Sequence, residues 1–269
     1  NASSIAIFLC NLPQEIPAIL CPSINSATFR KFCNVEIDAV IESIDVSTIY
    51  KVPILMKEEG LDEVVLRKLD LESDHKPNLE QWNKFLDSLN NPKSEISIAV
   101  VGKYVELPDA YKSIAEAIIH AGASNECKVN VKWIHSENIN TDNVQDELSN
   151  INGLLVAPGF GDRGIEGKID SIRYVRENNI PFFGICLGMQ SAVIEYSRNI
   201  IKIPDANSTE MDPNTSNAVI DLMENQKNIL EKGGTMRLGS YTCNLKEDSK
   251  CAQAYQQSNI SERHRHRFE

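Results

Sequence analysis

The segment PFFGICLGMQ, residues 181–190, decides the fold, because a short apolar run ends in Gly-x-Cys-x-Gly and then opens into a helical pattern. Strand, sharp turn and helix in this order are typical of a nucleophile elbow, which presents its central residue at a sheet edge. Gly184 and Gly188 supply the space that the turn needs. We therefore predict that Cys186 meets the positive end of the following helix, which favours the thiolate over the thiol. A lone cysteine in an apolar strand is more often buried and structural, but the two glycines and the helix start favour a nucleophile.

Strands and helices alternate four times on the N-terminal side of this elbow. The predicted strands are apolar runs at residues 96–101, 129–133, 154–157 and 180–185. The predicted helices between them cover residues 109–122, 144–148 and 165–175. Asp109 is the expected cap of the first helix and Gly122 its end. This order predicts an α/β fold with a doubly wound, mostly parallel sheet and flanking helices, whose functional residues lie at the carboxyl ends of the strands.

A second glycine-rich turn, Pro-Gly-Phe-Gly at residues 158–161, follows the strand 154–157. Parallel strands would bring this turn to the same edge as Cys186. Attack of a thiolate on an amide or ester carbon places negative charge on oxygen, and backbone N–H groups near Gly159 and Leu187 are the predicted donors to it. Taken alone, residues 158–161 would be interpreted as an ordinary tight turn.

The composition excludes several classes of function. The 269 residues contain 27 basic and 38 acidic side chains, for a net charge of −11, which disfavours nonspecific binding to nucleic acid or to anionic membranes. No apolar stretch approaches the roughly 20 residues of a membrane span. Seven cysteines without a Cys-x-x-Cys pair indicate neither a disulfide framework nor a metal site. We expect a cytoplasmic protein, because a reducing compartment suits unpaired cysteines.

Changes in composition along the chain predict three parts. Residues 1–70 mix short apolar runs with prolines, and residues 71–94 form a polar linker interrupted by a short amphipathic turn around Trp82. Residues 95–269 carry the regular alternation. The chain begins with Asn1, and we expect it to be a piece of something longer.

Several segments around the elbow resemble the CTP synthase family, which joins a synthetase domain to a class I glutamine amidotransferase domain. Within residues 95–269, the matching segments are 101–113, 159–167, 207–210, 233–239 and 262–267. Residues 45–53, DVSTIYKVP, resemble the tail of the synthetase domain. The resemblance covers roughly residues 32–269. It implies that residues 1–70 are a remnant of the synthetase domain and residues 95–269 a C-terminally truncated glutaminase domain.

The resemblance implies a role for each matched residue. Cys186 attacks the side-chain amide of glutamine, and Gly159 and Leu187 hold the oxyanion. Glutamine binding falls to the same two donors together with Gly188, Met189, Gln190, Glu210 and Arg267. A carboxylate and a guanidinium suit the charged ends of a free amino acid, although alone each would be interpreted as a solvated surface group. Nucleotide contacts are implied for Val46, toward ATP, and for Arg163 and Glu166, toward GTP.

For the full-length enzyme, the resemblance implies ATP-dependent amination of UTP to CTP with ammonia from glutamine. ATP and Mg²⁺ would be required, GTP would activate, no cofactor would be covalently bound, and the enzyme would be a homotetramer. Its partners are therefore the small molecules glutamine, UTP, ATP and GTP.

The chain departs from the family pattern in ways that predict an impaired piece. The family completes its Cys-His-Glu triad in a His-Pro-Glu segment beyond the 262–267 motif, and no such segment follows here. No phosphate loop of the form Gly-x-x-x-x-Gly-Lys-[Ser/Thr] occurs, and Thr28 stands where a lysine is expected. A proline also falls one position late, since Ala157-Pro158 stands where many relatives have Pro-Gly. His264 and His266 are candidate substitute bases, but histidines in a charged surface segment are more often solvated, which is the favoured interpretation.

Two other hypotheses stay open. The chain could be a stand-alone cysteine glutaminase or hydrolase subunit, or a non-catalytic protein that binds nucleotides or assembles through the same fold. The match at residues 45–53 favours a CTP synthase piece over the first of these, because a free-standing glutaminase has no use for a synthetase tail.

Overall fold

The computed structural model describes residues 19–21, 39–71, 76–107, 109–227, 239–264 and 266–269. The chain divides into two compact units, Asn1–Pro92 and Lys93–Glu269. Thr28 and most of the 233–239 motif lie outside the described residues. The predicted domain boundaries at residues 70 and 94 stay predictions.

The described residues of the first unit form a parallel strand pair followed by helices. Strands β1 (Ile19–Cys21) and β2 (Val40–Glu42) pair in parallel, and the chain continues through η2 (Ile49–Lys51), α2 (Val52–Glu58), α3 (Leu61–Lys68) and α4 (Glu80–Asn90). Ala39, Ile41 and Val64 form its small buried core. Helix α4 is longer than the single turn predicted there, and Trp82 Nε1 donates to the Tyr50 carbonyl at 2.8 Å, so α4 packs against the η2 segment.

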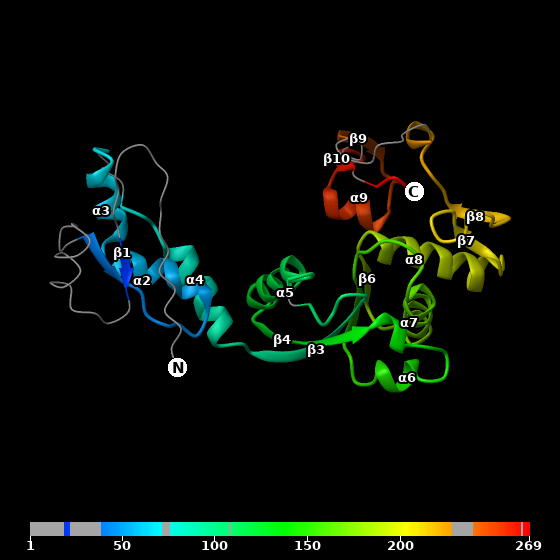
Figure 1. Ribbon diagram of the computed structural model, residues 1–269, viewed down its shortest axis with the longest axis horizontal. Coiled ribbons are helices and arrows are strands. Elements are labelled where there is room, and N and C mark those ends of the chain that lie inside the picture. The colour runs from blue at the N-terminus through cyan, green and yellow to red at the C-terminus, as the bar shows by residue number, and fades with distance from the viewer. Residues whose placement is uncertain (1–18, 22–38, 72–75, 108, 228–238, 265) are drawn as a thin grey trace. The chain divides into compact units, whose positions relative to one another are not determined.

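The second unit is built on a four-stranded parallel sheet in the order β4-β3-β5-β6 (Figure 1). Its strands are β3 (Ser94–Gly102), β4 (Cys127–His135), β5 (Gly153–Val156) and β6 (Phe182–Gly184). All three pairings are parallel, which confirms the predicted fold class. The chain reverses its direction across the sheet between β3 and β5. Such a switch point leaves a crevice at the carboxyl ends of the strands, where ligands bind in folds of this type.

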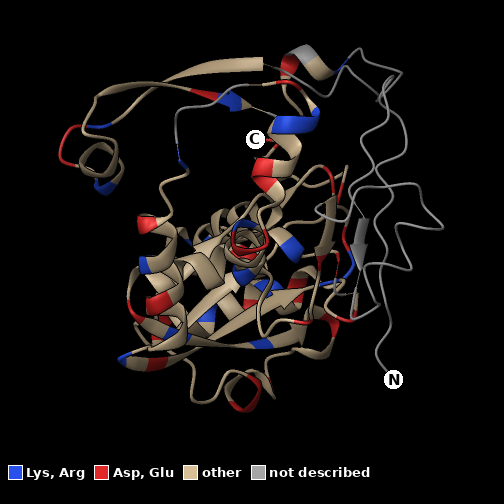
Figure 2. Cartoon of the chain, turned by 90° about the vertical axis from the view of Figure 1, so that its left-hand side faces the viewer, with Lys and Arg blue, Asp and Glu red and all other residues tan. Residues whose placement is uncertain are grey.

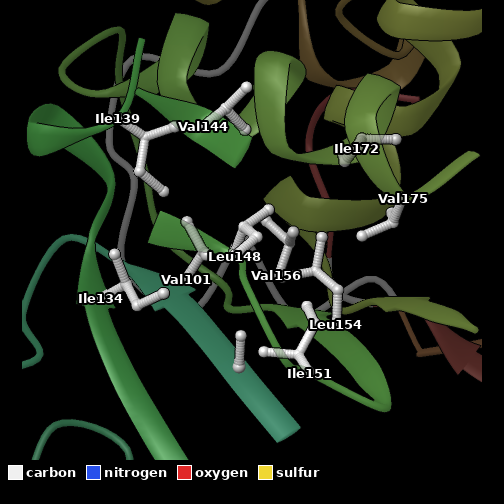
Figure 3. Close-up of a cluster of buried hydrophobic side chains, with 11 residues drawn as sticks. Val101, Ile134, Ile139, Val144, Leu148, Ile151, Leu154, Val156, Ile172 and Val175 are labelled. Carbon is white, nitrogen blue, oxygen red and sulfur yellow. The ribbon is translucent and has the colours of Figure 1, made fainter. Parts of the chain in front are cut away.

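Helices pack on both faces of the sheet, to which alternate residues of each strand point. On one face, Ala99, Val101 and Val156 pack with α6 (Val144–Glu147) and α7 (Ile165–Glu177), and Figure 3 shows this cluster closing between strands and helices. On the other face, Val100 packs with Tyr111 and with residues of α5 (Lys112–Ser124).

Helix α5 differs from the prediction at both ends. It begins at Lys112 with Tyr111 in the N-cap position, and Asp109 lies exposed in the preceding turn. Tyr111 is fixed because its ring stacks on Trp133 and its hydroxyl accepts from Lys103 N at 3.1 Å. The helix also continues past Gly122 to Ser124. A methyl group on Gly122 would lie 2.6 Å from the Cys127 carbonyl oxygen, so this glycine permits close packing instead of ending the helix.

The C-terminal part of the second unit adds short elements around α8 (Leu187–Tyr196). Helix α8 lies beside α7 and continues into η4 (Ser197–Ile201). Two strand pairs follow: β7 (Ala206–Ser208) with β8 (Asn217–Ile220), and β9 (Gly239–Asn244) with β10 (Asn259–His264). The remaining elements are η3 (Ser136–Asn138), η5 (Glu224–Gln226) and α9 (Lys250–Tyr255).

Acidic and basic positions are interspersed along the described helices (Figure 2). Among the residues that the structure describes, none of the helices combines the length and the apolar character that crossing a bilayer would take.

Candidate active site

Cys186 occupies the sharp turn between β6 and α8, as the elbow pattern predicts. Its backbone has φ 55° and ψ −111°, a conformation that side-chain-bearing residues rarely adopt. The turn closes because Gly184 and Gly188 let backbones approach. A methyl group on Gly184 would lie 2.6 Å from the Gly188 carbonyl carbon, and one on Gly188 would collide with the Val156 carbonyl oxygen. The elbow therefore packs directly against β5 through contacts that only glycine allows.

The structure brings Gly159 and Leu187 to the Cys186 sulfur. The backbones of Leu187 and of Gly159 lie close enough to the sulfur to favour its charged form, which lowers the pKa of the thiol. A methyl group on Gly159 would lie 3.4 Å from Leu187 Cδ2, so the turn after β5 lies directly against the start of α8. Two N–H groups that converge on a nucleophile are the arrangement that stabilises a developing oxyanion.

The charge state predicted for Cys186 was wrong. Burial raises the pKa of the Cys186 thiol above its ordinary value, and the negative charge of Glu210 raises it further. The backbones of Leu187 and Gly159 and the Lys168 charge lower this pKa, but they do not overcome the effect of burial. Desolvation penalises a thiolate more than the helix start compensates, so the chain holds this sulfur as a thiol.

Two lysines that sequence reasoning left without a role hold the turn after β5. Lys103 is 2% exposed at the end of β3, and its Nζ donates to the carbonyls of Phe160 and Gly161, the latter at 2.8 Å. Lys168 of α7 is fully buried, and its Nζ donates to the Ala157 carbonyl at 3.0 Å. The sequence offered one signal for this role, the charged Lys168 within the apolar stripe of Ile165 and Ile169. Lysine is almost never fully buried without a partner.

Glu210 lies at the same turn. Its Oε1 accepts from the Gly161 N–H at 3.0 Å, and its own N–H donates to Ser208 Oγ at 3.2 Å. Its charge acts on both Cys186 and Lys103. The predicted binding carboxylate is thus held at the turn after β5, close enough for its charge to act on the nucleophile.

The other predicted glutamine-binding residues lie on α8 and in the C-terminal segment. Gln190 is buried, and its Nε2 donates to the Phe268 carbonyl at 2.9 Å, which ties α8 to the residue after Arg267. Arg267 itself donates to the side chain and the carbonyl of Gln226 at 3.3 and 3.4 Å, instead of to Glu210. Gly188 is buried in the first turn of α8, whereas Met189 is 40% exposed beside it.

The residues predicted to contact nucleotides lie among protein side chains in this structure. Arg163 pairs with Glu137 at 3.2 Å and lies over the Tyr104 ring, and Glu166 pairs with Arg198 at 3.0 Å. Val46 belongs to the first unit, where it lines a hollow with Asp45, Lys51, Glu58 and others.

The two histidines of the 262–267 motif pack on each other. The ring centroids of His264 and His266 are 5.5 Å apart, and His264 lies 5.1 Å from the Tyr241 ring and 3.5 Å from a Glu269 carboxylate oxygen. Burial lowers the pKa of His266, with the neighbouring His264 adding to this effect. Over the described ranges, no group of three or more His, Cys, Asp or Glu side chains is arranged to hold a metal ion.

Comparisons with known proteins give matches to both units of the chain. The family model for glutamine amidotransferase class-I matches residues 106–269, and the model for the CTP synthase N-terminus matches residues 17–71. The CTP synthase of Cytophaga hutchinsonii is 59% identical over 98% of this chain and 48% of its own length. That of Flavobacterium johnsoniae is 63% identical over 88% of this chain and 44% of its own.

A solved structure shares the fold of the site-bearing unit. The glutaminase domain of Trypanosoma brucei CTPS, with bound acivicin, aligns with a TM-score of 0.59 at 34% identity. The alignment covers 65% of this chain and 67% of that one. The chain spans about half the length of the curated relatives it matches.

Proposed function

The chain belongs to the glutamine amidotransferase class-I family, and from this premise we propose that it carries the glutamine-hydrolysing centre of a CTP synthase. The observation that carries the proposal is the meeting of the Gly159 turn with the start of α8 at the Cys186 sulfur, whose pKa the backbones of Gly159 and Leu187 both lower. Donors already directed at the nucleophile need little reorganisation when the substrate oxygen becomes charged beside it.

The proposed reaction forms and breaks one bond to sulfur. The Cys186 sulfur, after losing its proton, attacks the side-chain amide carbon of glutamine, and the carbonyl electrons move to oxygen. This oxyanion accepts hydrogen bonds from Gly159 and Leu187 while the nitrogen takes up a proton and leaves as ammonia. Water then attacks the thioester, which releases glutamate and restores the thiol.

Recognition of glutamine rests on charge. Glu210 supports an assignment to the substrate ammonium, because its carboxylate lies at the nucleophile and is already oriented by the Gly161 N–H. Arg267 is assigned to the substrate carboxylate and would exchange its contacts with Gln226 for it. Gly188, Met189 and Gln190 complete the site at the start of α8.

The proton carrier is assigned to none of the residues that the structure describes. His264 and His266 are engaged with Tyr241, Glu269 and each other, and the charges that act on Cys186 come from Glu210 and Lys168. We propose that the base and its orienting acid come from a segment outside residues 1–269, as the family pattern implies. The chain alone should therefore hydrolyse glutamine far more slowly than the whole protein.

For the whole protein, the proposal extends to the ATP-dependent amination of UTP by the released ammonia. The match of residues 17–71 to the CTP synthase N-terminus supports a synthetase part over a free-standing glutaminase. Val46 as an ATP contact, Arg163 and Glu166 as GTP contacts, the homotetramer and the cytoplasmic location belong to this extension. The described residues hold no cluster suited to Mg²⁺, so that ion is assigned to none of them.

Labelling of the thiol tests the proposal on this chain. We expect a glutamine-analogue electrophile, 6-diazo-5-oxo-L-norleucine, to modify Cys186 stoichiometrically and at least about tenfold faster than Cys127, because binding holds the reactive carbon at the sulfur. Peptide mass spectrometry measures both rates in one sample. Glu210→Gln should slow this probe but not iodoacetamide, which needs no amino-acid site. Equal rates at Cys186 and Cys127 would reject the proposal.

Replacement of the nucleophile tests the extension to the whole protein. In the full-length enzyme, Cys186→Ala should abolish CTP formation from glutamine and leave formation from added ammonia, because the thiol serves ammonia supply alone. Loss of both activities would contradict this division of labour.

A further inference from the structure

Lys168 is a buried cation on the core-facing side of α7. Its neighbours in the same stripe, Ile165 and Ile169, are each 4% exposed, and Lys168 itself is 0% exposed. Its ammonium donates to a backbone carbonyl, that of Ala157, at 3.0 Å. Placing a charge in such surroundings is costly, so its presence here calls for a physical role.

The ammonium lies behind the peptide that faces the nucleophile. Ala157 immediately precedes Pro158-Gly159, and a methyl group on Gly159 would lie 3.8 Å from Lys168 Nζ. On its other side, the Gly159 peptide lies against Leu187, next to Cys186, and its backbone favours the charged form of the Cys186 sulfur. The Gly159 peptide therefore lies between Lys168 Nζ and the Cys186 sulfur at the edge of the sheet.

The charged groups around Lys168 come from several elements. Lys103, from the end of β3, is the cation that acts on it, and Cys186 is the group that a charged Lys168 favours as thiolate. Glu210 acts on Cys186 in the opposite direction. Farther along the turn, Asp162, Arg163 and Glu137 act on Lys103. Burial, with the Lys103 charge second, lowers the pKa of Lys168 to about 8, so it carries charge at neutral pH.

We propose that Lys168 is a positioning residue for the glutamine hydrolysis proposed above. Its bond to the Ala157 carbonyl fixes the turn so that the Gly159 N–H stays directed at the reacting atoms, and its charge stands behind the thiolate and the oxyanion. The inference rests on the proposed function, because a positioned oxyanion donor matters only where an acyl group is transferred. Lys168 touches neither substrate nor sulfur and acts through the peptide between them.

Lys168→Met tests the role in the 269-residue chain, because methionine has nearly the same length and carries neither charge nor donor. Arg173→Met is the matched control: it removes a cation from the same helix, where Arg173 pairs with Asp170 at 3.0 Å. The measurement is the rate of Cys186 alkylation by iodoacetamide from pH 6 to pH 10, read by peptide mass spectrometry. Circular dichroism confirms that each variant is folded.

In Lys168→Met we expect the rate at pH 7.5, where Lys168 still carries charge, to fall about threefold to tenfold, since a nearby cation favours the thiolate. Near pH 10, where Lys168 has lost its proton, the rates of the variant and the wild type should converge. Arg173→Met should match the wild type. An unchanged rate at pH 7.5 in folded Lys168→Met would overturn the inference. If that variant does not fold, Lys168→Gln takes its place, and failure of both to fold would assign Lys168 a purely structural role.

The two proposals fail in different ways. If the glutamine analogue shows no preference for Cys186 in the wild type, the proposed function fails whatever the Lys168 variants do. If that preference is present and the iodoacetamide rate at pH 7.5 is unchanged in Lys168→Met, the function stands and the role of Lys168 is rejected.

Discussion

The two turns that meet at the sheet edge are held by different means. The Cys186 turn is held locally, because Gly184 and Gly188 let β6, β5 and the start of α8 approach backbone to backbone. The turn at residues 157–161 is held from a distance by the side chains of Lys103, Lys168 and Glu210, which come from three other places in the chain. The first turn depends on having no side chains, and the second depends on particular ones.

The largest expected effect breaks the local turn. Gly188→Ala should lower the free energy of unfolding by about 3 kcal/mol, because the added methyl group meets the Val156 carbonyl and the backbone must shift. In the other turn, Gly161 has φ 68° and nothing within 4 Å of an added methyl group, so Gly161→Ala should cost about 1 kcal/mol of conformational strain. Urea titration at pH 7 measures both. Equal losses would show that close packing does not distinguish the turns.

The second largest effect concerns Lys168, which sharpens the comparison. This residue holds the turn at residues 157–161 but lowers the free energy of unfolding. The pKa of Lys168, lowered from 10.5 to about 8, corresponds to about 3 kcal/mol against folding at neutral pH. Replacing Lys168 by methionine removes this penalty but also removes the hydrogen bond to Ala157, which offsets about 1 kcal/mol of the gain. Lys168→Met should therefore raise the free energy of unfolding by about 2 kcal/mol at pH 7.

The sign of the pH dependence follows from the same pKa. Because the folded-state pKa lies below the unfolded one, the unfolded chain binds the extra proton between about pH 8 and 10.5. The penalty of burying Lys168 is thus complete below pH 8 and disappears as the pH rises toward 10.5. The advantage of Lys168→Met should shrink across that range, while Arg173→Met shows no such trend. A constant difference in urea titrations at pH 7 and pH 10 would contradict the assignment.

This contrast also explains what could be predicted from the sequence. The elbow, the parallel sheet and the stripe Ile165, Ile169, Ile172 and Val175 follow from local spacing, and the structure confirms them. Lys168 interrupts that stripe, but no local pattern connects it with Ala157, eleven residues earlier. Tyr111 likewise replaces Asp109 at the helix start because of contacts with Lys103 and Trp133. Long-range side-chain partners decide these points, and spacing alone does not reveal them.

The charge on Cys186 shows the same limit. The position of the sulfur at a helix start was predictable, and the expected thiolate followed from that position alone. The outcome depends on how deeply the sulfur is buried and on Glu210, a residue 24 positions away that the fold brings beside it. Burial is a property of the folded chain, so the direction of this pKa could not be obtained from the elbow motif.

The smallest expected effect returns to the backbone of the elbow. Cys186 has φ 55° and ψ −111°, so any residue with a β-carbon is strained there. Cys186→Gly and Cys186→Ala both remove the sulfur and its contacts with the neighbouring N–H groups, and they differ in this strain. We expect Cys186→Gly to be more stable than Cys186→Ala by about 1 kcal/mol, because glycine adopts positive φ freely and gives back part of the gain as chain entropy. Urea titrations of the two variants measure the difference. If the alanine variant were the more stable, the strain would not be stored at Cys186, and the local turn would depend on its glycines alone.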